Sequence, residues 1–326
     1  MNHFTHKLAM PNWEDGVDVF IWGDEQEGSE AYRADAFAAF KADWKRSKNP
    51  YAIGIGDYRD FMRPSMGERI DSVLVRDKSL KKQLDDLVRP GVEKTAARLE
   101  FMKGRILGMH EGHHDYEFSS GMNGTQMLAE ALKTTNLGWM ASHRLSIDFP
   151  EKNNTDDKNR SYSVTGATSH GNASGRNTTS VAQSMEQSMK DLVCNFKVQG
   201  HACRSASWSP HPYRTVRRNG PPGVNTLVCE HLLVGGFCDS YTDGWISKPI
   251  EEGVGERRKQ IGGRPASGYA ERRNLTPQVV SWGIIRVHFR ANLAQAREIG
   301  VSDRTRLLDI EAIRRCPTLA EDGRYY

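Results

Sequence analysis

The sequence predicts an α/β protein in which several strands run parallel and end at a shared edge. Short apolar runs alternate with segments of helical spacing, and this order is typical of parallel strands joined by helices. Several of the apolar runs are followed within a few residues by a glycine beside an aspartate or a histidine. Because parallel strands end at the same edge of a sheet, these polar side chains are expected to form one site.

The first elements predict a strand, a helix and a second strand. Val17–Trp22 is a short, largely apolar run that favours a buried strand, and Ser29 is placed to cap a helix over residues 31–44. One face of this helix carries Ala36, Phe37, Phe40 and Trp44. After Pro50, residues 51–55 predict a second strand, which is expected to lie parallel to the first.

The rest of the chain continues this alternation. Further helices are predicted over residues 70–87, 92–102, 125–133 and 181–192, with Pro90 and Gly91 separating the first two. Further strands are predicted over residues 105–108, 144–149, 161–168, 195–199, 225–237 and 279–289. We expect one domain over residues 1–290 and a C-terminal helical extension or tail over residues 291–326.

Composition narrows the class of protein. The chain has 326 residues and a net charge of +4, which suits a phosphate-bearing substrate but does not by itself predict nucleic-acid binding. Its five cysteines form no CxxC pair, so no disulfide framework is expected. No glycine-rich nucleotide motif follows a predicted strand. We see neither a signal peptide nor a membrane-spanning run, and we expect a cytoplasmic protein with no membrane partner.

Two aspartates follow the first two predicted strands. Asp24 lies in the turn after Val17–Trp22, and Asp57 follows residues 51–55 and Gly56. Each aspartate taken alone is compatible with a simple turn former or helix cap. Adjacent parallel strands, however, would bring the two carboxylates together, and a cation is the usual way to offset their repulsion. The pair therefore favours a metal site.

A pair of histidines follows a later strand. Gly112 is followed by His113, His114 and Asp115, and a polar loop without any ligand is the plainer interpretation of this segment. Two adjacent imidazoles point in different directions, so one can bind a metal while its neighbour acts as an acid or a base. The segment therefore supplies both a candidate ligand and a candidate catalytic residue.

Two more histidines and a cysteine follow the strands beyond. His170 and His201 each stand at the end of a predicted strand, before a polar loop. Cys203 offers a thiolate for a cation such as zinc or iron, although a small buried apolar residue is the alternative. Each of these signals is weak alone, and their common position at strand ends is what connects them.

The order of these motifs resembles that of the calcineurin-like metallophosphoesterases. The family pattern runs D-x-H-x-G, GD, GNH[D/E], a histidine in a His-Gly turn, and GHxH. In the same order this chain has Asp24-Glu25-Gln26-Glu27-Gly28, Gly56-Asp57, Gly112-His113-His114-Asp115, His170-Gly171 and Gly200-His201-Ala202-Cys203. Two later segments resemble the closing strands of phage-type members, namely Gly235-Gly236-Phe237 and Tyr269-Ala270-Glu271. The similarity spans about residues 17–290.

The resemblance implies a fold and a metal centre. The fold would be two packed, mostly mixed β-sheets flanked by helices, a four-layer αββα sandwich with the metal site at strand ends. Two divalent metal ions (Mn, Zn or Fe) would be bound, with Asp57 bridging them. The second ion would also be held by His113, His170 and His201, and the first by Asp24, Gln26 and Cys203.

The resemblance also implies catalytic roles and shows where this chain departs from the family. His114 would protonate the leaving oxygen, and Asp115 would orient His114. His113 stands where the family has asparagine, whereas Gln26 and Cys203 stand where it has histidine. These departures leave the second metal site with a full set of ligands, whereas they change two ligands of the first metal site.

The predicted function is metal-dependent hydrolysis of a phosphoester, as a phosphodiesterase or phosphatase that uses a bridging hydroxide. Nucleotides and nucleic acids are among the candidate substrates, and a phage-encoded chain would act in the host cytoplasm. A DNA or RNA nuclease of the same family is one alternative, which predicts salt-sensitive polymer binding. A non-catalytic binding protein with a degenerate first metal site is the other, which predicts one or no bound metal and no turnover.

Overall fold

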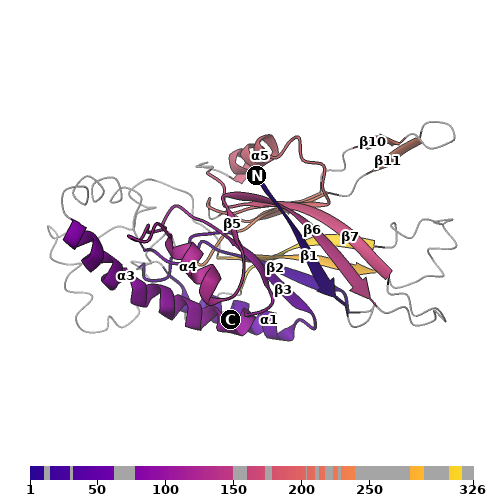
Figure 1. Ribbon diagram of the computed structural model, residues 1–326. Helices are drawn as coiled ribbons and strands as arrows, with labels where there is room; N and C mark the ends of the chain where they lie inside the picture. The colour runs from indigo at the N-terminus through magenta and orange to yellow at the C-terminus, as the bar shows by residue number, and fades with distance from the viewer. Residues whose placement is uncertain are drawn as a thin grey trace, which may run out of the picture.

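Two six-stranded β-sheets form the centre of the molecule, with helices on the outer face of each (Figure 1). The computed structural model describes residues 1–10, 15–29, 32–61, 78–149, 160–172, 178–202, 204–209, 213–216, 223–226, 229–238, 280–289 and 308–317. No described helix is both long and apolar enough to cross a membrane.

The described elements are as follows. The helices are α1 (Ala34–Arg46), α3 (Lys78–Leu99), α4 (Gly124–Ala131) and α5 (Thr178–Ser188), with a 3₁₀ turn η1 at Glu100–Met102. The strands are β1 (Asn2–Ala9), β2 (Val17–Trp22), β3 (Pro50–Gly54), β4 (Ile106–His110), β5 (Asn136–Gly138), β6 (Met140–Phe149), β7 (Arg160–Ser169), β8 (Phe196–Gln199), β9 (Ala206–Trp208), β10 (Tyr213–Val216), β11 (Gly223–Thr226), β12 (Glu230–Leu233), β13 (Trp282–Phe289) and β14 (Leu308–Arg315).

Both large sheets are mixed. Sheet 1 has the order β1-β6-β7-β8-β12-β9, and sheet 2 has the order β14-β13-β2-β3-β4-β5, while β10 and β11 pair only with each other. In sheet 2, β2, β3 and β4 are parallel neighbours, as the strand–helix–strand pattern predicts. In sheet 1, β7, β8 and β12 are parallel neighbours.

Three apolar cores separate four layers. The core between the sheets includes Ile21 of β2 and Leu145 of β6. The second core joins sheet 2 to α1, α3 and α4, and the third joins sheet 1 to α5. Figure 1 accordingly shows α5 on one side of the sheets and α1, α3 and α4 on the other. The predicted αββα sandwich is therefore confirmed.

Strand β2 shows why the sheets pack in this way. All six of its residues are buried. Val19 and Ile21 face sheet 1, whereas Phe20 and Trp22 face the helices. Side chains alternate between the faces of a strand, and a strand covered on both faces is therefore apolar throughout. Phe40 of α1 meets the outward face, with its ring centroid 5.9 Å from that of Phe20.

Two sequence predictions for the helices are corrected. Pro90 lies inside the continuous helix α3, so it does not separate two helices. An interior proline costs a helix on the order of 3 kcal/mol, and burial of flanking residues such as Val92 and Leu99 against sheet 2 offsets this cost. The N-cap of α1 is Arg33 rather than Ser29. Residues 70–77 of the predicted helix lie outside the described residues.

The chain ends contribute strands that were not expected. β1 pairs in parallel with β6 at the edge of sheet 1. β14 falls within residues 291–326, where a helical extension or tail is predicted, and it pairs antiparallel with β13 in sheet 2. The helical prediction is therefore wrong for Leu308–Arg315. The boundary at residue 290 otherwise stays a prediction, because residues 290–307 and 318–326 lie outside the described residues.

Candidate metal centre

Five predicted site residues follow the carboxyl ends of strands in the two sheets. Asp24, Asp57 and His113 follow β2, β3 and β4, the parallel neighbours of sheet 2. His170 and His201 follow β7 and β8, the parallel neighbours of sheet 1. Because the two sheets pack face to face, these residues reach the same edge of the sandwich from opposite layers.

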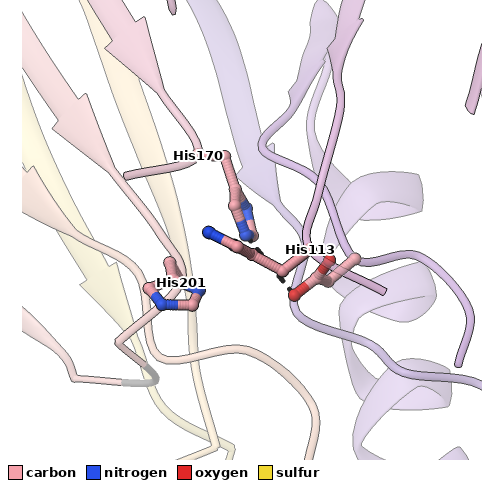
Figure 2. Close-up of side chains that lie close together, drawn as sticks. His113, His170 and His201 are labelled. Carbon is pink, nitrogen blue, oxygen red and sulfur yellow. Dashed lines mark ion pairs between the residues drawn. The ribbon is translucent and has the colours of Figure 1, made fainter. Parts of the chain in front are cut away.

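Four of these side chains converge on one point. One ligand atom from each of Asp57, His113, His170 and His201 lies within 4.8 Å of all the others. The imidazole centroids of His113 and His201 are 4.2 Å apart, and those of His113 and His170 are 5.0 Å apart. Figure 2 shows the three imidazoles gathered around a common centre. The structure thus brings together every residue predicted for the second metal, and this cluster could bind a metal ion.

The donor atoms of the cluster fit a divalent cation. His170 donates through Nδ1 to the carbonyl of Ile55 at 2.6 Å, which leaves Nε2 facing Asp57 Oδ2 at 3.4 Å. A carbonyl that holds one ring nitrogen is a common way to orient a metal-binding imidazole. Among the described residues, His113 Nδ1 is buried without a hydrogen-bond partner. One carboxylate and three imidazoles are a donor set suited to zinc, manganese or iron.

Electrostatics within the cluster distinguish its members. Although burial lowers the pKa of His170, the close contact with the negatively charged Asp57 raises it to about 9. Burial opposes the ionisation of Asp57, but its contacts with His170 hold its pKa below the usual value. Burial lowers the pKa of His201 to about 4, helped by His170 and His113, and it also lowers the pKa of His113. Neutral imidazoles at these two positions are in the form that binds metals.

Asp24 lies beside the cluster, and its two carboxylate oxygens are in different environments. Its Oδ2 accepts the backbone N–H of His201 at 2.8 Å. Its Oδ1 is buried and has no hydrogen-bond partner within the described part of the chain. Burial raises the pKa of Asp24 to about 7, and the charge of Asp57 adds to this effect while His170 opposes it. A buried carboxylate that is disfavoured in its charged form would be stabilised by a nearby cation, so Asp24 fits a second cation position beside Asp57.

Several site residues hold a left-handed backbone. The φ angles are 48° at Asp24, 45° at Gln26, 53° at Asp57 and 66° at His201. Residues other than glycine rarely adopt this region, and where they do they often mark functional sites. The half-buried Gln26 is held by its backbone N–H, which donates to the carbonyl of Asp57 at 2.8 Å. The two acidic motifs are therefore joined by their backbones as well as by their position.

Gly112 shows how closely the loops approach one another. A Cβ atom at this position would lie 2.0 Å from Asp57 Oδ1 and 2.4 Å from the backbone nitrogen of Asp57. Asp57 Oδ1 also accepts the backbone N–H of His114 at 2.9 Å. Only glycine leaves room for this contact. The glycine before the histidine pair is thus needed for the geometry of the cluster.

Asp60, rather than Asp115, pairs with the catalytic candidate His114. The Nδ1 atom of His114 lies 2.9 Å from Asp60 Oδ1. Asp115 instead accepts the backbone N–H of Thr125 at 3.1 Å, in the first turn of α4. The expected contact between Asp115 and His114 is therefore corrected. Burial opposes the charged form of His114, but the hydrogen bond to Asp60 and the charge of Asp57 raise its pKa above the usual value.

Glu25 and Glu27, to which the sequence analysis gave no role, anchor the loop that carries Asp24. Glu25 is fully buried, accepts from Trp22 Nε1 at 2.9 Å and forms an ion pair with Arg98 of α3. Glu27 accepts from Thr95 Oγ1 at 2.7 Å and from Arg59 at 3.1 Å. These contacts tie the Asp24 loop to α3. No local pattern indicates them, because most of the partners lie far apart in the chain.

The first predicted metal site is only partly described. Asp24 and Gln26 are placed at its edge, but Cys203 lies outside the described residues. The assignment of all seven predicted ligands, and of His114 and Asp115 as catalytic residues, remains a prediction about function. Asp60 is the residue that sequence reasoning missed, and its one signal was an acid three positions after Asp57.

Comparisons with known proteins give only weak likenesses. No protein-family model and no curated protein matches the chain. A single mutant of Vps29 from Entamoeba histolytica is 10% identical, with 91% of this chain and 99% of that chain covered and a TM-score of 0.31. A candidate 5′-nucleotidase from Staphylococcus aureus, in complex with alpha-ketoglutarate, is 9% identical, with 94% and 56% covered and a TM-score of 0.33. Neither likeness carries an argument about function, so the site must be interpreted from its own residues.

Proposed function

We propose that this chain is a metal-dependent phosphoester hydrolase of the calcineurin-like metallophosphoesterase type. The observation that carries the proposal is the convergence of Asp57, His113, His170 and His201, whose ligand atoms lie within 4.8 Å of one another. Asp24 adds a buried carboxylate at the edge of this cluster. A divalent cation held there supplies Lewis-acid chemistry, which polarises a phosphoryl oxygen and lowers the pKa of a water molecule.

His114 is the proposed proton donor to the leaving oxygen. Asp60 holds Nδ1 at 2.9 Å, so Nε2 is the nitrogen left for the substrate. The side chain is 20% exposed, so part of the imidazole is accessible from solvent. Its backbone N–H donates to Asp57 at 2.9 Å. The same carboxylate therefore enters the metal cluster and fixes the position of the acid.

Metal content and turnover together test the proposal. The purified full chain is loaded with manganese, zinc or iron, its metal content is measured by elemental analysis, and hydrolysis of p-nitrophenyl phosphate and bis(p-nitrophenyl) phosphate is followed. Asp57→Asn should lose both bound metal and activity. His114→Asn should keep its metal but lose roughly 10²- to 10⁴-fold in rate, the usual contribution of general acid catalysis.

A matched control separates loss of function from loss of fold. His231 on β12 is buried, at 4% exposure, but is not part of the cluster. His231→Asn should therefore keep both metal content and turnover. Thermal unfolding of all three variants, followed by circular dichroism, shows whether each one folds.

Each remaining outcome decides between the proposal and its alternatives. A wild-type chain that binds no metal would refute the metal centre itself. Bound metal without turnover of any phosphoester would favour the non-catalytic binding protein. Salt-sensitive cleavage of DNA or RNA, with little action on small esters, would favour the nuclease.

A further inference from the structure

Trp139 is a half-exposed indole beside the candidate metal cluster. Its side chain is 47% exposed, and it is the one aromatic residue among the exposed large hydrophobic side chains of the described residues. Its ring centroid lies 4.7 Å from that of His113 at an interplanar angle of 74°. The corresponding values for His170 are 5.8 Å and 65°. Core packing does not explain a large aromatic side chain at this position.

The backbone around Trp139 holds the indole at the cluster. Trp139 stands between β5 and β6, and its carbonyl accepts the backbone N–H of His170 at 3.2 Å. Gly138, just before it, has a φ of 67°, and the carbonyl of Gly138 accepts from His110 Nδ1 at 2.7 Å. The backbone of Trp139 is therefore tied to the segment that carries His170, and the indole starts from a fixed point beside the cluster.

The two edge-on contacts leave much of the indole accessible. His113 and His170 occupy part of its surface, and nearly half of the side chain stays exposed next to the half-buried His113. An indole that is nearly half exposed can stack against another flat ring. Because the indole centroid lies 4.7 Å from that of His113, a flat substituent on a phosphate bound at the cluster would be within reach of the indole.

We propose that Trp139 is a stacking platform for a flat aromatic group on the substrate. The substrate class would then be a nucleotide or an aryl phosphoester rather than an alkyl phosphoester. This inference rests on the proposed phosphoesterase function and adds the group that the phosphate carries. Stacking of one base on an aromatic side chain strengthens binding by about 5- to 150-fold.

Binding of paired ligands tests the platform without measuring turnover. The full chain carrying His114→Asn, in which turnover is suppressed, is loaded with manganese and studied by isothermal titration calorimetry. Adenosine 5′-monophosphate is compared with ribose 5-phosphate, which lacks only the base. Phenyl phosphate is compared with methyl phosphate, and inorganic phosphate reports on the metal cluster alone. The two pairs distinguish a nucleobase from a directly attached aryl ring.

Three substitutions are compared in this background. Trp139→Leu removes the aromatic ring, whereas Trp139→Phe keeps one. Trp208→Leu is the matched control, because Trp208 is also a partly exposed indole packed edge-on against a histidine. Its centroid lies 5.0 Å from that of His231 at 85°, and neither residue belongs to the cluster.

The expected result is a selective loss. Trp139→Leu should weaken binding of the aromatic member of at least one pair by roughly tenfold, while inorganic phosphate binds as before. Trp139→Phe should retain most of the preference, and Trp208→Leu all of it. Equal weakening of all five ligands would overturn the proposal, because the indole would then only position the histidines. Unchanged binding in Trp139→Leu would overturn it as well. Failure of the unsubstituted background to bind inorganic phosphate would instead count against the proposed function, and the inference would fall with it.

Discussion

Replacing Thr168 with valine should destabilise the fold by about 2–6 kcal/mol, the cost of leaving two buried imidazole nitrogens unpaired. Thr168 of β7 is fully buried, and its hydroxyl lies 2.6 Å from the Nε2 atoms of both His110 and His143. His143 Nδ1 lies 3.1 Å from His6 Nε2, and His110 Nδ1 lies 2.7 Å from the carbonyl of Gly138. This chain of hydrogen bonds links sheet 1 to sheet 2.

The carbonyl at one end fixes the direction of every bond in this chain. Because the carbonyl of Gly138 can only accept, Nδ1 of a neutral His110 carries the proton and Nε2 accepts from the hydroxyl of Thr168. The hydroxyl has a single proton, so it must accept from His143 Nε2. His143 Nδ1 then accepts from His6. Valine has nearly the volume of threonine but can make neither of the two bonds, so the cost is polar rather than steric.

Urea unfolding at about pH 8, where these imidazoles are neutral, measures the effect. Thr168→Ser is the control, because it keeps the hydroxyl and loses only one methyl group. The free energy of unfolding of Thr168→Val should fall well below that of Thr168→Ser. If valine proved as stable as serine or more so, the hydroxyl would not hold these histidines and the reasoning would be refuted.

Three further results are expected. Burial lowers the pKa of His110 to about 4, below the 6.5 of an unfolded chain, so the unfolded state binds more protons at this residue between these values. The contribution of His110 to stability should therefore be complete above pH 6.5 and be lost toward pH 4, and an unchanged pH dependence of the urea midpoint in His110→Gln would contradict this. Gly112→Ala places a Cβ 2.0 Å from Asp57 Oδ1 and should weaken metal binding by roughly 10- to 100-fold, as a metal titration can show. Asp60→Asn should slow phosphoester turnover by about 10- to 100-fold with metal content retained, whereas Asp115→Asn should have the smaller effect; the reverse order would restore the role that sequence assigned to Asp115.

Local patterns in the sequence predicted the elements around the site well. Strand β2 has the predicted bounds, and the predicted apolar face of α1 is the face that is buried. Both depend on residues that are close in sequence, where side-chain periodicity is a direct consequence of backbone geometry. The strand at Leu308–Arg315 could not be predicted in this way, because it depends on pairing with the distant β13 and nothing in its own composition indicates that partner.

Pairings between distant side chains could not be predicted from local patterns either. His114 is adjacent to Asp115 in sequence, yet its ring nitrogen pairs with Asp60, which lies 54 positions away. The side chains of adjacent residues on an extended loop point in different directions. Adjacency in sequence is therefore a poor guide to whether two side chains form a hydrogen bond. Trp139 gave no sequence signal, since an aromatic residue between two strands is usually part of a core.

Two glycines, Gly112 and Gly200, explain how the loops of the site can approach one another so closely. A Cβ at Gly200 would lie 2.4 Å from Ile55 Cδ1 and 3.0 Å from Asp24 Oδ2, much as a Cβ at Gly112 would meet Asp57. Gly200, which follows β8 of sheet 1, therefore allows its loop to approach Asp24, which follows β2 of sheet 2. Gly112, which follows β4, allows its loop to approach Asp57, which follows the neighbouring strand β3. Such close approach depends on the absence of a Cβ atom at each glycine. The two glycines thus explain how loops from both sheets come close enough for four ligand atoms to converge.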